Sequence, residues 1–319
     1  MADILKSLRA AADETRLRIL SVLGSEPLAV GEILEILGMG QSRISRHLKI
    51  LADAGLLESH RLGNRVYYGL AGQSRVEPLI RELLDALTQI TESNNGLYRG
   101  IVRDRSKLTE ILELRKQMSV DHFQRMGREH DRMQQTFVDS SYYRREIINE
   151  LGAKPGTVVD LGCGTGELSV MIARLAGKAI GVDQSPRVLE LARSACPQGE
   201  FRLGEIEHLP LPDEGADAVV ASMVLHHLPD PSSGLKEANR VLRKKGTLVV
   251  VDLKEHDEEA MQREFADFWP GFSGDRLEAM IQDAGFSIQE KRAGQGDGKL
   301  TCLIYRATKQ TTGGLNANA

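Results

Sequence analysis

The sequence predicts a multidomain chain in which an N-terminal helical domain with a β-hairpin is joined by a helical connector to a C-terminal α/β domain. Apolar residues recur at helical spacing through the first half of the 319 residues, whereas from Thr157 onward short β-branched runs alternate with helix-compatible segments. The length fits about two domains. A composition of 41% hydrophobic and 27% charged residues is ordinary for a globular chain with two cores.

Residues 1–95 are expected to form the first domain. One short helix ends at Gly38, and the next opens near Gln41 and ends at Gly55, since glycine readily takes the left-handed conformation that closes a helix. The period then changes to two in "LLESHR" and "RVYYGLA", which flank a Gly63-Asn64 turn. Helices followed by such a hairpin predict a winged helix-turn-helix.

Residues 96–150 are predicted to form a helical connector, because they are amphipathic and contain no proline. Residues 151–308 are predicted to form the α/β domain, with a doubly wound parallel sheet that ends in an antiparallel edge. The tail at 309–319 is polar and glycine-rich, and we expect it to be disordered. The expected strands are "TVVDL", "AIGVD", "EFRLG", "ADAVVAS", "TLVVVDL", "FSIQEK" and "LTCLIYRA".

Overall charge and cysteine usage exclude several classes of protein. The net charge of −4 means that nucleic-acid binding would need a local basic patch. The three cysteines are far apart and form no C-x-x-C pair, which argues against a disulfide framework or a zinc knuckle. Charges recur through the N-terminus, and no apolar run approaches the ~20 residues of a membrane span. We therefore expect a cytoplasmic protein with no membrane partner.

The helix that opens near Gln41 separates an apolar face from a polar one. Its polar face could enter the major groove, which is read by short polar or bidentate side chains on an exposed helix. The stretch from Gln41 to Arg65 has five basic and two acidic residues, a local charge of +3. A solvated basic helix would look similar, but the hairpin that follows favours DNA binding. The residues expected at DNA are Gln41, Ser42, Arg43, Ser45, Arg46 and Lys49 on the helix, with Arg61, Asn64 and Arg65 on the hairpin.

The segment from "DETRLRILSVL" to "QSRISRHLKILADAGLLESHRLGNRVYYGL" resembles the ArsR/SmtB family of winged-helix repressors. The resemblance implies a homodimer on a double-stranded DNA operator, with half-sites about one helical turn apart. It would also imply a metal site, but "LAVGE" stands where the family carries its cysteine box. The histidines of this domain, His47 and His60, lie in the expected DNA-binding region. We therefore expect no metal at the family's usual positions.

The stretch "VVDLGCGTGE" places an acid at the end of a hydrophobic strand, followed by three glycines at alternate positions before a helix. Glycine lets the backbone turn tightly and approach a ligand. A dinucleotide fold would require G-x-G-x-x-G, but Glu167 stands at the position of the third glycine of a frame beginning at Gly162 and Gly164. A carboxylate there disfavours pyrophosphate, so NAD and FAD are rejected as cofactors.

This stretch resembles instead the first motif of class I S-adenosylmethionine-dependent methyltransferases, and "GVDQSP" and "LGEIEHLPLPDEGADAVVASMVLHHL" are similar to later segments of the UbiE-like branch. The resemblance implies a Rossmann-like seven-stranded methyltransferase domain that binds S-adenosylmethionine and releases S-adenosylhomocysteine. Asp183 would accept both ribose hydroxyls, and Glu205, where the family commonly has Asp, would lie by the adenine. The implied cofactor residues are Asp160, Gly162, Cys163, Gly164, Gly166, Asp183, Gln184, Glu205, Ile206, Ser222 and Met223.

Methyl transfer from a sulfonium is an in-line displacement, so the protein mainly aligns and desolvates the reactants. A general base is needed only where the nucleophile carries a proton. His226 and His227 are candidates for it, with a structural or pocket-lining role as the alternative. Arsenic methylation would need closely placed thiols, which the three cysteines do not provide, and we reject it. Candidates for the substrate pocket, chosen by position, are His130, Tyr142, Tyr143, His256 and Trp269, although a buried Trp is more often part of a core.

Two functions are compatible with this combination of domains. In the first, the chain is a DNA-binding transcriptional regulator with an active methyltransferase domain for a small-molecule acceptor. In the second, the cofactor pocket is a sensor of S-adenosylmethionine or S-adenosylhomocysteine that controls operator binding. A helical connector favours coupling of the two domains, because packed helices transmit a two-state shift better than a flexible linker. We favour the first function.

Overall fold

The computed structural model describes residues 2–24, 27–62, 65–71, 82, 86, 96–126, 136–258 and 268–310. The predicted Gly63-Asn64 turn, the substrate candidate His130 and the tail after Gln310 lie outside these residues. The chain divides into two compact units, of which the first is Met1–Lys116 with Asp257–Glu259 and the second is Gln117–His256 with Ala260–Ala319.

The first unit is a winged helix-turn-helix, as the sequence predicts. Gly38 ends the helix Val30–Leu37 with φ +65°, and Gly55 follows the expected DNA-binding helix Gln41–Asp53 with φ +71°, so both glycines take the expected left-handed conformation. A three-stranded sheet has the order β1-β3-β2, and its short first strand is not evident in the sequence. The elements are α1 (Ala2–Ala11), α2 (Glu14–Leu23), β1 (Leu28–Ala29), α3 (Val30–Leu37), α4 (Gln41–Asp53), β2 (Leu57–Leu62), β3 (Arg65–Leu70) and α6 (Gly96–Met126) as far as Lys116.

Helix α6 is part of the core of the first unit. Ile101 and Leu108 are 2% and 6% exposed, and Leu108 packs in one apolar cluster with buried residues of the other helices, such as Ile19 and Ile33. The sequence predicts that these residues belong to the connector. Their burial shows that the apolar stripe of α6 completes the winged-helix core up to Lys116.

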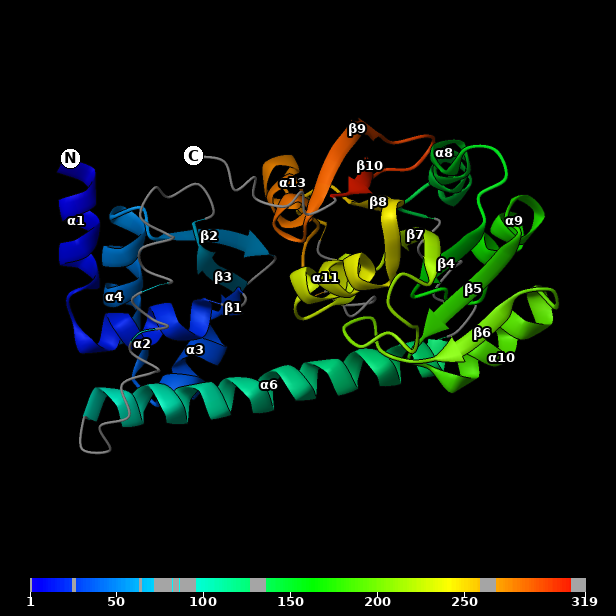
Figure 1. The fold of residues 1–319 in the computed structure, drawn as a ribbon. Helices are drawn as coiled ribbons and strands as arrows, with labels where there is room; N and C mark the ends of the chain where they lie inside the picture. The colour runs from blue at the N-terminus through cyan, green and yellow to red at the C-terminus, as the bar shows by residue number, and fades with distance from the viewer. Residues whose placement is uncertain are drawn as a thin grey trace. The chain divides into compact units, whose positions relative to one another are not determined.

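The second unit is an α/β domain with a seven-stranded sheet (Figure 1). The strand order is β6-β5-β4-β7-β8-β10-β9, in which β10 runs antiparallel between β8 and β9 and the other neighbours are parallel. Its elements are α8 (Ser140–Leu151), β4 (Thr157–Leu161), α9 (Glu167–Leu175), β5 (Lys178–Asp183), α10 (Pro186–Ala195), β6 (Glu200–Leu203), β7 (Ala216–Ser222), η1 (Leu225–His227), α11 (Pro231–Val241), β8 (Leu242–Leu253), α13 (Gly274–Asp283), β9 (Phe286–Gly294) and β10 (Cys302–Lys309).

All seven predicted strands are present, with one boundary clearly displaced. The sequence predicts a strand from Thr247, whereas β8 begins at Leu242. Leu242 pairs with Ala216, after which the register shifts and Lys245 takes φ +62°. The early part of β8 is therefore an irregular, mostly exposed extension, which lacks the apolar pattern that marks a buried strand.

Alternate strand residues face opposite sides of the sheet, and different helices cover the two sides (Figure 1). Val159 and Val219 face a cluster that includes buried residues of α11 and α13. Val158 and Val220 face a cluster that includes buried residues of α8 and α9. The parallel strands are consequently buried on both faces, so that ligands can reach the sheet only at the ends of the strands. Among the described residues, none of the helices has the length and apolarity that crossing a membrane requires.

Candidate functional site

Helix α4 presents a continuous polar face to solvent. Ile44, Leu48 and Leu51 are at most 1% exposed and attach the helix to the core of the first unit. The hairpin candidates Arg61 and Arg65 lie on the paired strands β2 and β3, while their side chains and the whole of Asn64 are outside the described residues. The predicted DNA-contacting residues of the helix are all exposed, and they are Gln41, Ser42, Arg43, Ser45, Arg46 and Lys49.

Neighbouring helices hold both halves of α4. At its C-terminal end, Ser7 Oγ of α1 donates to the carbonyl of Ala54 at 2.9 Å, and Lys6 Nζ donates to the carbonyl of Asp53. These donors satisfy carbonyls that the helix itself leaves unpaired. In the middle of α4, Nδ1 of His47 lies 3.7 Å from Oδ1 of Asp13, the residue that caps the N-terminus of α2. Burial lowers the pKa of His47. The orientation of the polar face is therefore fixed by α1 and α2.

A buried ion pair joins α6 to α2 and α3. The Asp104 carboxylate is fully buried and accepts from Nε and Nη2 of Arg18 at 2.6 and 2.9 Å. Arg18 also donates to the carbonyl of Leu37, the last residue of α3, at 3.3 Å. A bidentate pair of this kind fixes orientation as well as distance. It therefore defines the position of the C-terminal end of α3, directly before the turn into α4.

A second ion pair holds the other end of α3. Oε1 of Glu32 accepts from Nε of Arg115 on α6 at 2.7 Å, and its Oε2 accepts the N–H of Ala29 at 2.8 Å and a further bond from Arg115. Glu32 thus caps the N-terminus of α3 while it is paired with α6. Neither pair could be predicted from the sequence, because the partners are 83 and 86 positions apart in the chain.

In the second unit, a glycine-rich turn connects β4 to α9. Gly162, Gly164 and Gly166 have φ values of +62°, +53° and +86°, so each requires the freedom of glycine. A Cβ at Gly162 would collide with Val224, and one at Gly166 would lie 2.9 Å from Cα of Ala192. A Cβ at Gly164 would meet no atom closer than the carbonyl of Gly162 at 4.0 Å. Two of the glycines are therefore required by packing, whereas Gly164 leaves open backbone.

Asp183 ends β5 next to this turn. Its Oδ2 accepts the N–H of Gly164 at 3.1 Å and its Oδ1 accepts the N–H of Ser185 at 2.9 Å. Burial raises the pKa of Asp183, while these backbone donors oppose the increase. The carboxylate is thus rigidly oriented at the carboxyl edge of the sheet, beside open backbone. This position suits the binding of a diol, because a carboxylate can accept from two hydroxyls.

Asp160 lies near the end of β4, two positions before Gly162 of the glycine-rich turn. It is 3% exposed and its Oδ2 accepts from Oγ of Ser169 on α9 at 2.6 Å. Burial raises its pKa to about 7, while the Ser169 hydrogen bond and the charge of Arg144 act in the opposite direction. Ser169 is not identified from the sequence. The hydrogen bond between Asp160 and Ser169 therefore links the end of β4 to α9.

The remaining predicted cofactor residues surround the same edge. Cys163 is buried and its N–H donates to the carbonyl of Val182 at 3.1 Å, so this residue contributes backbone to the turn, and burial raises the pKa of its thiol. Met223, directly after β7, has φ +53°, a strained conformation for a non-glycine residue. Of the other four predicted residues, Glu205 is exposed, Gln184 and Ser222 are partly exposed, and Ile206 is buried.

The two candidate bases occupy different environments. His226 is fully buried, and its Nδ1 lies 2.6 Å from Oδ1 of Asp252, which is also fully buried. Asp252 in addition accepts the N–H groups of Leu225 and Leu253. His227 is partly exposed and its ring centroid lies 4.0 Å from that of His226. Asp252 was missed by the sequence reading, although an acid that ends a hydrophobic strand is the same signal that identified Asp160.

The described substrate candidates do not form one cluster. Tyr143 is 4% exposed and packs in the core with α9, whereas the Tyr142 ring lies against Gly294 of β9. Trp269 is 5% exposed and its Nε1 donates to the carbonyl of Leu228 at 2.8 Å. The His256 N–H donates to the carbonyl of Pro270 at 3.0 Å. Trp269 and His256 belong to the segment beside η1, and their roles at a substrate remain predictions.

In the part of the chain that the structure describes, no group of three or more His, Cys, Asp or Glu side chains is placed to hold a metal ion. The cysteines Cys163, Cys196 and Cys302 are all buried thiols.

Comparison with known proteins identifies both units. Residues 13–59 match the family model of the bacterial regulatory proteins of the arsR family, and residues 159–250 match a methyltransferase domain model. A 37.1 kDa protein of transposon TN4556 from Streptomyces fradiae is 28% identical over 259 residues, which cover 73% of this chain and 72% of that protein. A demethylmenaquinone methyltransferase from Thermotoga maritima is 32% identical over 118 residues, covering 36% of this chain and 52% of that enzyme.

A solved structure agrees with the fold of the second unit. A chain from the complex between the Haloferax volcanii Trm112 methyltransferase activator and a methyltransferase superposes with a TM-score of 0.53 and 18% identity, covering 60% of this chain and 98% of that chain. The chain spans about half the length of the demethylmenaquinone methyltransferases that it matches. The fold and both matches define a helix-turn-helix domain joined to a methyltransferase domain. The chain thus carries an ArsR-family helix-turn-helix and a methyltransferase domain in one polypeptide, and the proteins that it matches include demethylmenaquinone methyltransferases.

Proposed function

We propose that this protein is a DNA-binding transcriptional regulator whose methyltransferase domain binds S-adenosylmethionine and transfers its methyl group to a small-molecule acceptor. The observation that carries the proposal is the corner formed by Gly164 and Asp183. Open backbone and an oriented carboxylate meet there, at the carboxyl ends of parallel strands.

The residues of this corner fit an adenosyl sulfonium. Glycine at 164 is not required by packing against the protein, so its lack of a Cβ leaves room for close approach of a ligand. Asp183 presents acceptors that a ribose diol can use, and Ile206 supplies a buried apolar surface for a flat base. The methyl group of the bound sulfonium would be activated by its positive charge.

In the proposed mechanism the protein supplies position rather than covalent chemistry. The Gly162–Gly166 turn and Asp183 would hold the adenosyl group at the edge of β4 and β5. The buried Asp252 holds His226 in one orientation, and the His226 carbonyl accepts the N–H groups of Phe268 and Trp269 at 3.0 and 3.1 Å. The loop after β7 is therefore rigid where an acceptor would be aligned. Of the two candidate bases, the partly exposed His227 is better placed to exchange a proton with solvent.

The DNA-binding part of the proposal depends on the exposed face of α4. Arg46 and Lys49 project from a helix that is held at both halves, which suits base and phosphate contacts in a major groove. We further propose a homodimer. Helix α1 exposes Ile4, Leu5 and Leu8 by 41%, 54% and 37%, an apolar face that a second copy could cover. Leu5→Lys is expected to shift the sedimenting species from dimer to monomer.

Titration calorimetry tests the proposed cofactor directly. The wild-type chain is expected to bind S-adenosylmethionine and S-adenosylhomocysteine. Asp183→Asn is expected to bind them about tenfold more weakly, since a charged acceptor of two hydroxyls is replaced by a neutral one. Asp213→Asn is the matched control, because Asp213 is an exposed carboxylate outside the corner. Incubation with labelled cofactor and a metabolite extract then reveals the acceptor. A wild-type chain that binds neither adenosyl compound refutes the proposal.

The same variants distinguish the enzyme from a cofactor sensor. A sensor changes its operator affinity when the cofactor binds, because coupling requires different affinities in the DNA-bound and free states. Operator affinity that responds to the cofactor in the wild type but not in Asp183→Asn, without methyl transfer to any extract component, would favour the sensor. Methyl transfer with unchanged operator affinity would favour an enzyme whose two domains act independently.

A further inference from the structure

The loop between β6 and β7 lies between the proposed cofactor corner and α11. Gly204 at its start donates to the carbonyl of Asp183 at 3.0 Å, so the loop leaves the sheet beside the proposed ribose acceptor. Two positions later, the side chain of Ile206 lies close to Gly162 of the glycine-rich turn. The same side chain approaches Gly234 of α11, where a Cβ would lie 3.0 Å from Cγ2 of Ile206. The first half of the loop thus contacts the cofactor turn and α11 together.

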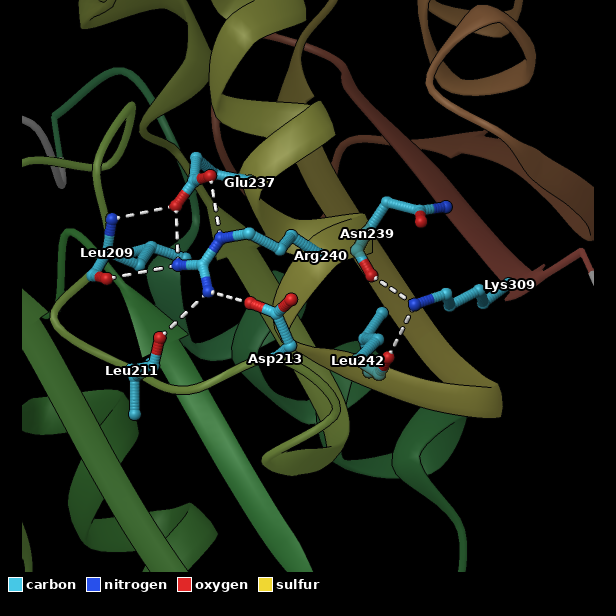
Figure 2. Close-up of polar contacts among 8 residues, drawn as sticks. All are labelled: Leu209, Leu211, Asp213, Glu237, Asn239, Arg240, Leu242 and Lys309. Carbon is cyan, nitrogen blue, oxygen red and sulfur yellow. Dashed lines mark hydrogen bonds and ion pairs between the residues drawn. The ribbon is translucent and has the colours of Figure 1, made fainter.

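Arg240 contacts three residues in the second half of this loop, which Arg202 also holds through the carbonyl of Pro210. Figure 2 shows the Arg240 guanidinium between Glu237 of its own helix and the loop residues Leu209, Leu211 and Asp213. Its Nε donates to Glu237 at 2.9 Å, its Nη1 to the Leu211 carbonyl at 2.9 Å and to Asp213 at 2.6 Å, and its Nη2 to the Leu209 carbonyl at 3.1 Å and to Glu237 at 2.8 Å. These bonds use all five N–H donors of the side chain.

Glu237 completes the attachment by contacting the loop itself. Its Oε2 accepts the N–H of Leu209 at 3.0 Å, so both backbone polar groups of Leu209 are held by the Arg240–Glu237 pair. The pair raises the pKa of Arg240 and lowers that of Glu237, mainly through their shared hydrogen bonds, so both groups stay charged at neutral pH. Leu209 and Leu211 are buried in the same core cluster as Ile206.

Helix α11 is capped at its N-terminus and attached to β10 at its C-terminal end. At the N-terminus, Asp230 accepts the N–H groups of Ser232 and Ser233 at 3.0 and 3.2 Å. At the other end, Nζ of Lys309 from β10 donates to the carbonyls of Asn239 and Leu242 at 2.7 and 2.8 Å (Figure 2). A cation at a helix C-terminus is favourable for the helix dipole as well. Arg240 therefore connects the loop to a rigid support.

We propose that Arg240 and Glu237 are positioning residues for recognition of the adenine end of the cofactor. Neither residue contacts the cofactor corner. They hold Leu209 and Leu211 against α11, and through the short connection from Ile206 to Leu209 they keep Ile206 beside Gly162. The inference builds on the proposed binding of an adenosyl cofactor. It assigns the rigidity of the adenine side to the partly exposed hydrogen-bond network around Arg240 and Glu237.

Titration calorimetry of the full chain with S-adenosylhomocysteine and with adenosine tests the proposal. Arg240→Met is expected to raise the Kd of both compounds by about tenfold, roughly the effect of having to order one backbone residue on binding. Glu237→Gln keeps an acceptor for Leu209 and is expected to weaken binding less. Asp213→Asn is the matched control on the same guanidinium. The Asp213 side chain is 77% exposed, and an exposed ion pair contributes little, so its Kd should stay within twofold of wild type.

A second measurement distinguishes a positioning role of Arg240 from a purely structural one. Urea unfolding followed by Trp269 fluorescence reports loss of stability, and Kd is measured where each variant is fully folded. Lower stability with a Kd within twofold of wild type in both Arg240→Met and Arg240→Lys overturns the proposal. Equal increases of Kd for S-adenosylhomocysteine and adenosine support it, because they locate the defect at the shared adenosine. A wild-type chain that binds neither compound overturns the cofactor assignment and this inference together, whereas normal wild-type binding confines any failure to the inference.

Discussion

Folding makes the carboxyl group of Asp160 harder to ionise. It is 3% exposed at the end of β4, and burial raises its pKa to about 7, against about 3.9 for a free Asp side chain. The folded state therefore binds a proton more tightly than the unfolded chain between about pH 4 and pH 7. Stability due to this group is consequently highest at low pH and decreases as the pH rises toward 7 and the carboxylate must be charged.

Asp160→Asn removes this charge and retains an oxygen acceptor for Ser169. A shift of about three pK units at about 1.4 kcal/mol each corresponds to a cost of about 4 kcal/mol for the fully ionised group. Between about pH 5 and about pH 8 the cost grows by about 2–3 kcal/mol. The free energy of unfolding of Asp160→Asn, relative to wild type, is therefore expected to increase by that amount over this range.

Urea unfolding followed by the fluorescence of Trp269 measures this difference for the methyltransferase unit. Trp269 is the only tryptophan of the chain and is buried in that unit. Ser169→Ala is the matched variant. It removes the hydrogen bond that lowers the pKa of Asp160, so the pH dependence should extend to higher pH. A free-energy difference between Asp160→Asn and wild type that does not change from about pH 5 to about pH 8 would refute the reasoning.

Three further predictions test other parts of the molecule. Arg46→Ala is expected to weaken operator binding by about 1–3 kcal/mol and to relax preference at one base pair, as measured by fluorescence anisotropy, and an equal loss on unrelated DNA would contradict base readout. Asp104→Asn leaves the buried Arg18 without its carboxylate and is expected to destabilise the winged-helix unit by about 3–5 kcal/mol, visible as faster hydrogen exchange in α2 and α3. Arg103→Ala, at an exposed partner of Asp104, is its control and should change exchange little. Gly166→Ala is expected to destabilise the methyltransferase unit by about 2–4 kcal/mol in the Trp269 assay, because its Cβ would meet Ala192 at a φ of +86°. Gly164→Ala should destabilise the unit less than Gly166→Ala but impair cofactor binding. A larger loss of stability in Gly164→Ala, with normal cofactor binding, would argue against a ligand site at Gly164.

Local sequence patterns predicted much of the architecture. The glycines at 38 and 55, the hairpin and all seven strands of the second unit could be predicted, because helix caps and strand periodicity are set by residues close together in the chain. The exposed face of α4 followed from the spacing of Ile44, Leu48 and Leu51. The same holds for the glycine-rich turn, whereas Asp183, which ends β5, is a cofactor candidate because of the resemblance to methyltransferases.

Interactions between distant segments could not be predicted in this way. The sequence placed the residues of α6 in a connector, and only the fold shows Asp104 buried against Arg18 and Arg115 paired with Glu32. Ile206 was predicted beside the cofactor, but nothing near it in the chain indicates that Arg240 holds its loop.

The sequence by itself therefore determined most of the helices and strands, apart from β1 and the early part of β8, and which short motifs could bind DNA or a nucleoside. Only the tertiary structure decided that Asp160 is buried with a pKa near 7, that His226 is held by Asp252, and that β10 lies between β8 and β9. The physical reason is that burial and pairing depend on which surfaces meet when the chain closes on itself. Backbone preference and apolar periodicity act over a few residues, whereas desolvation and ion pairing act between segments that the fold alone brings together.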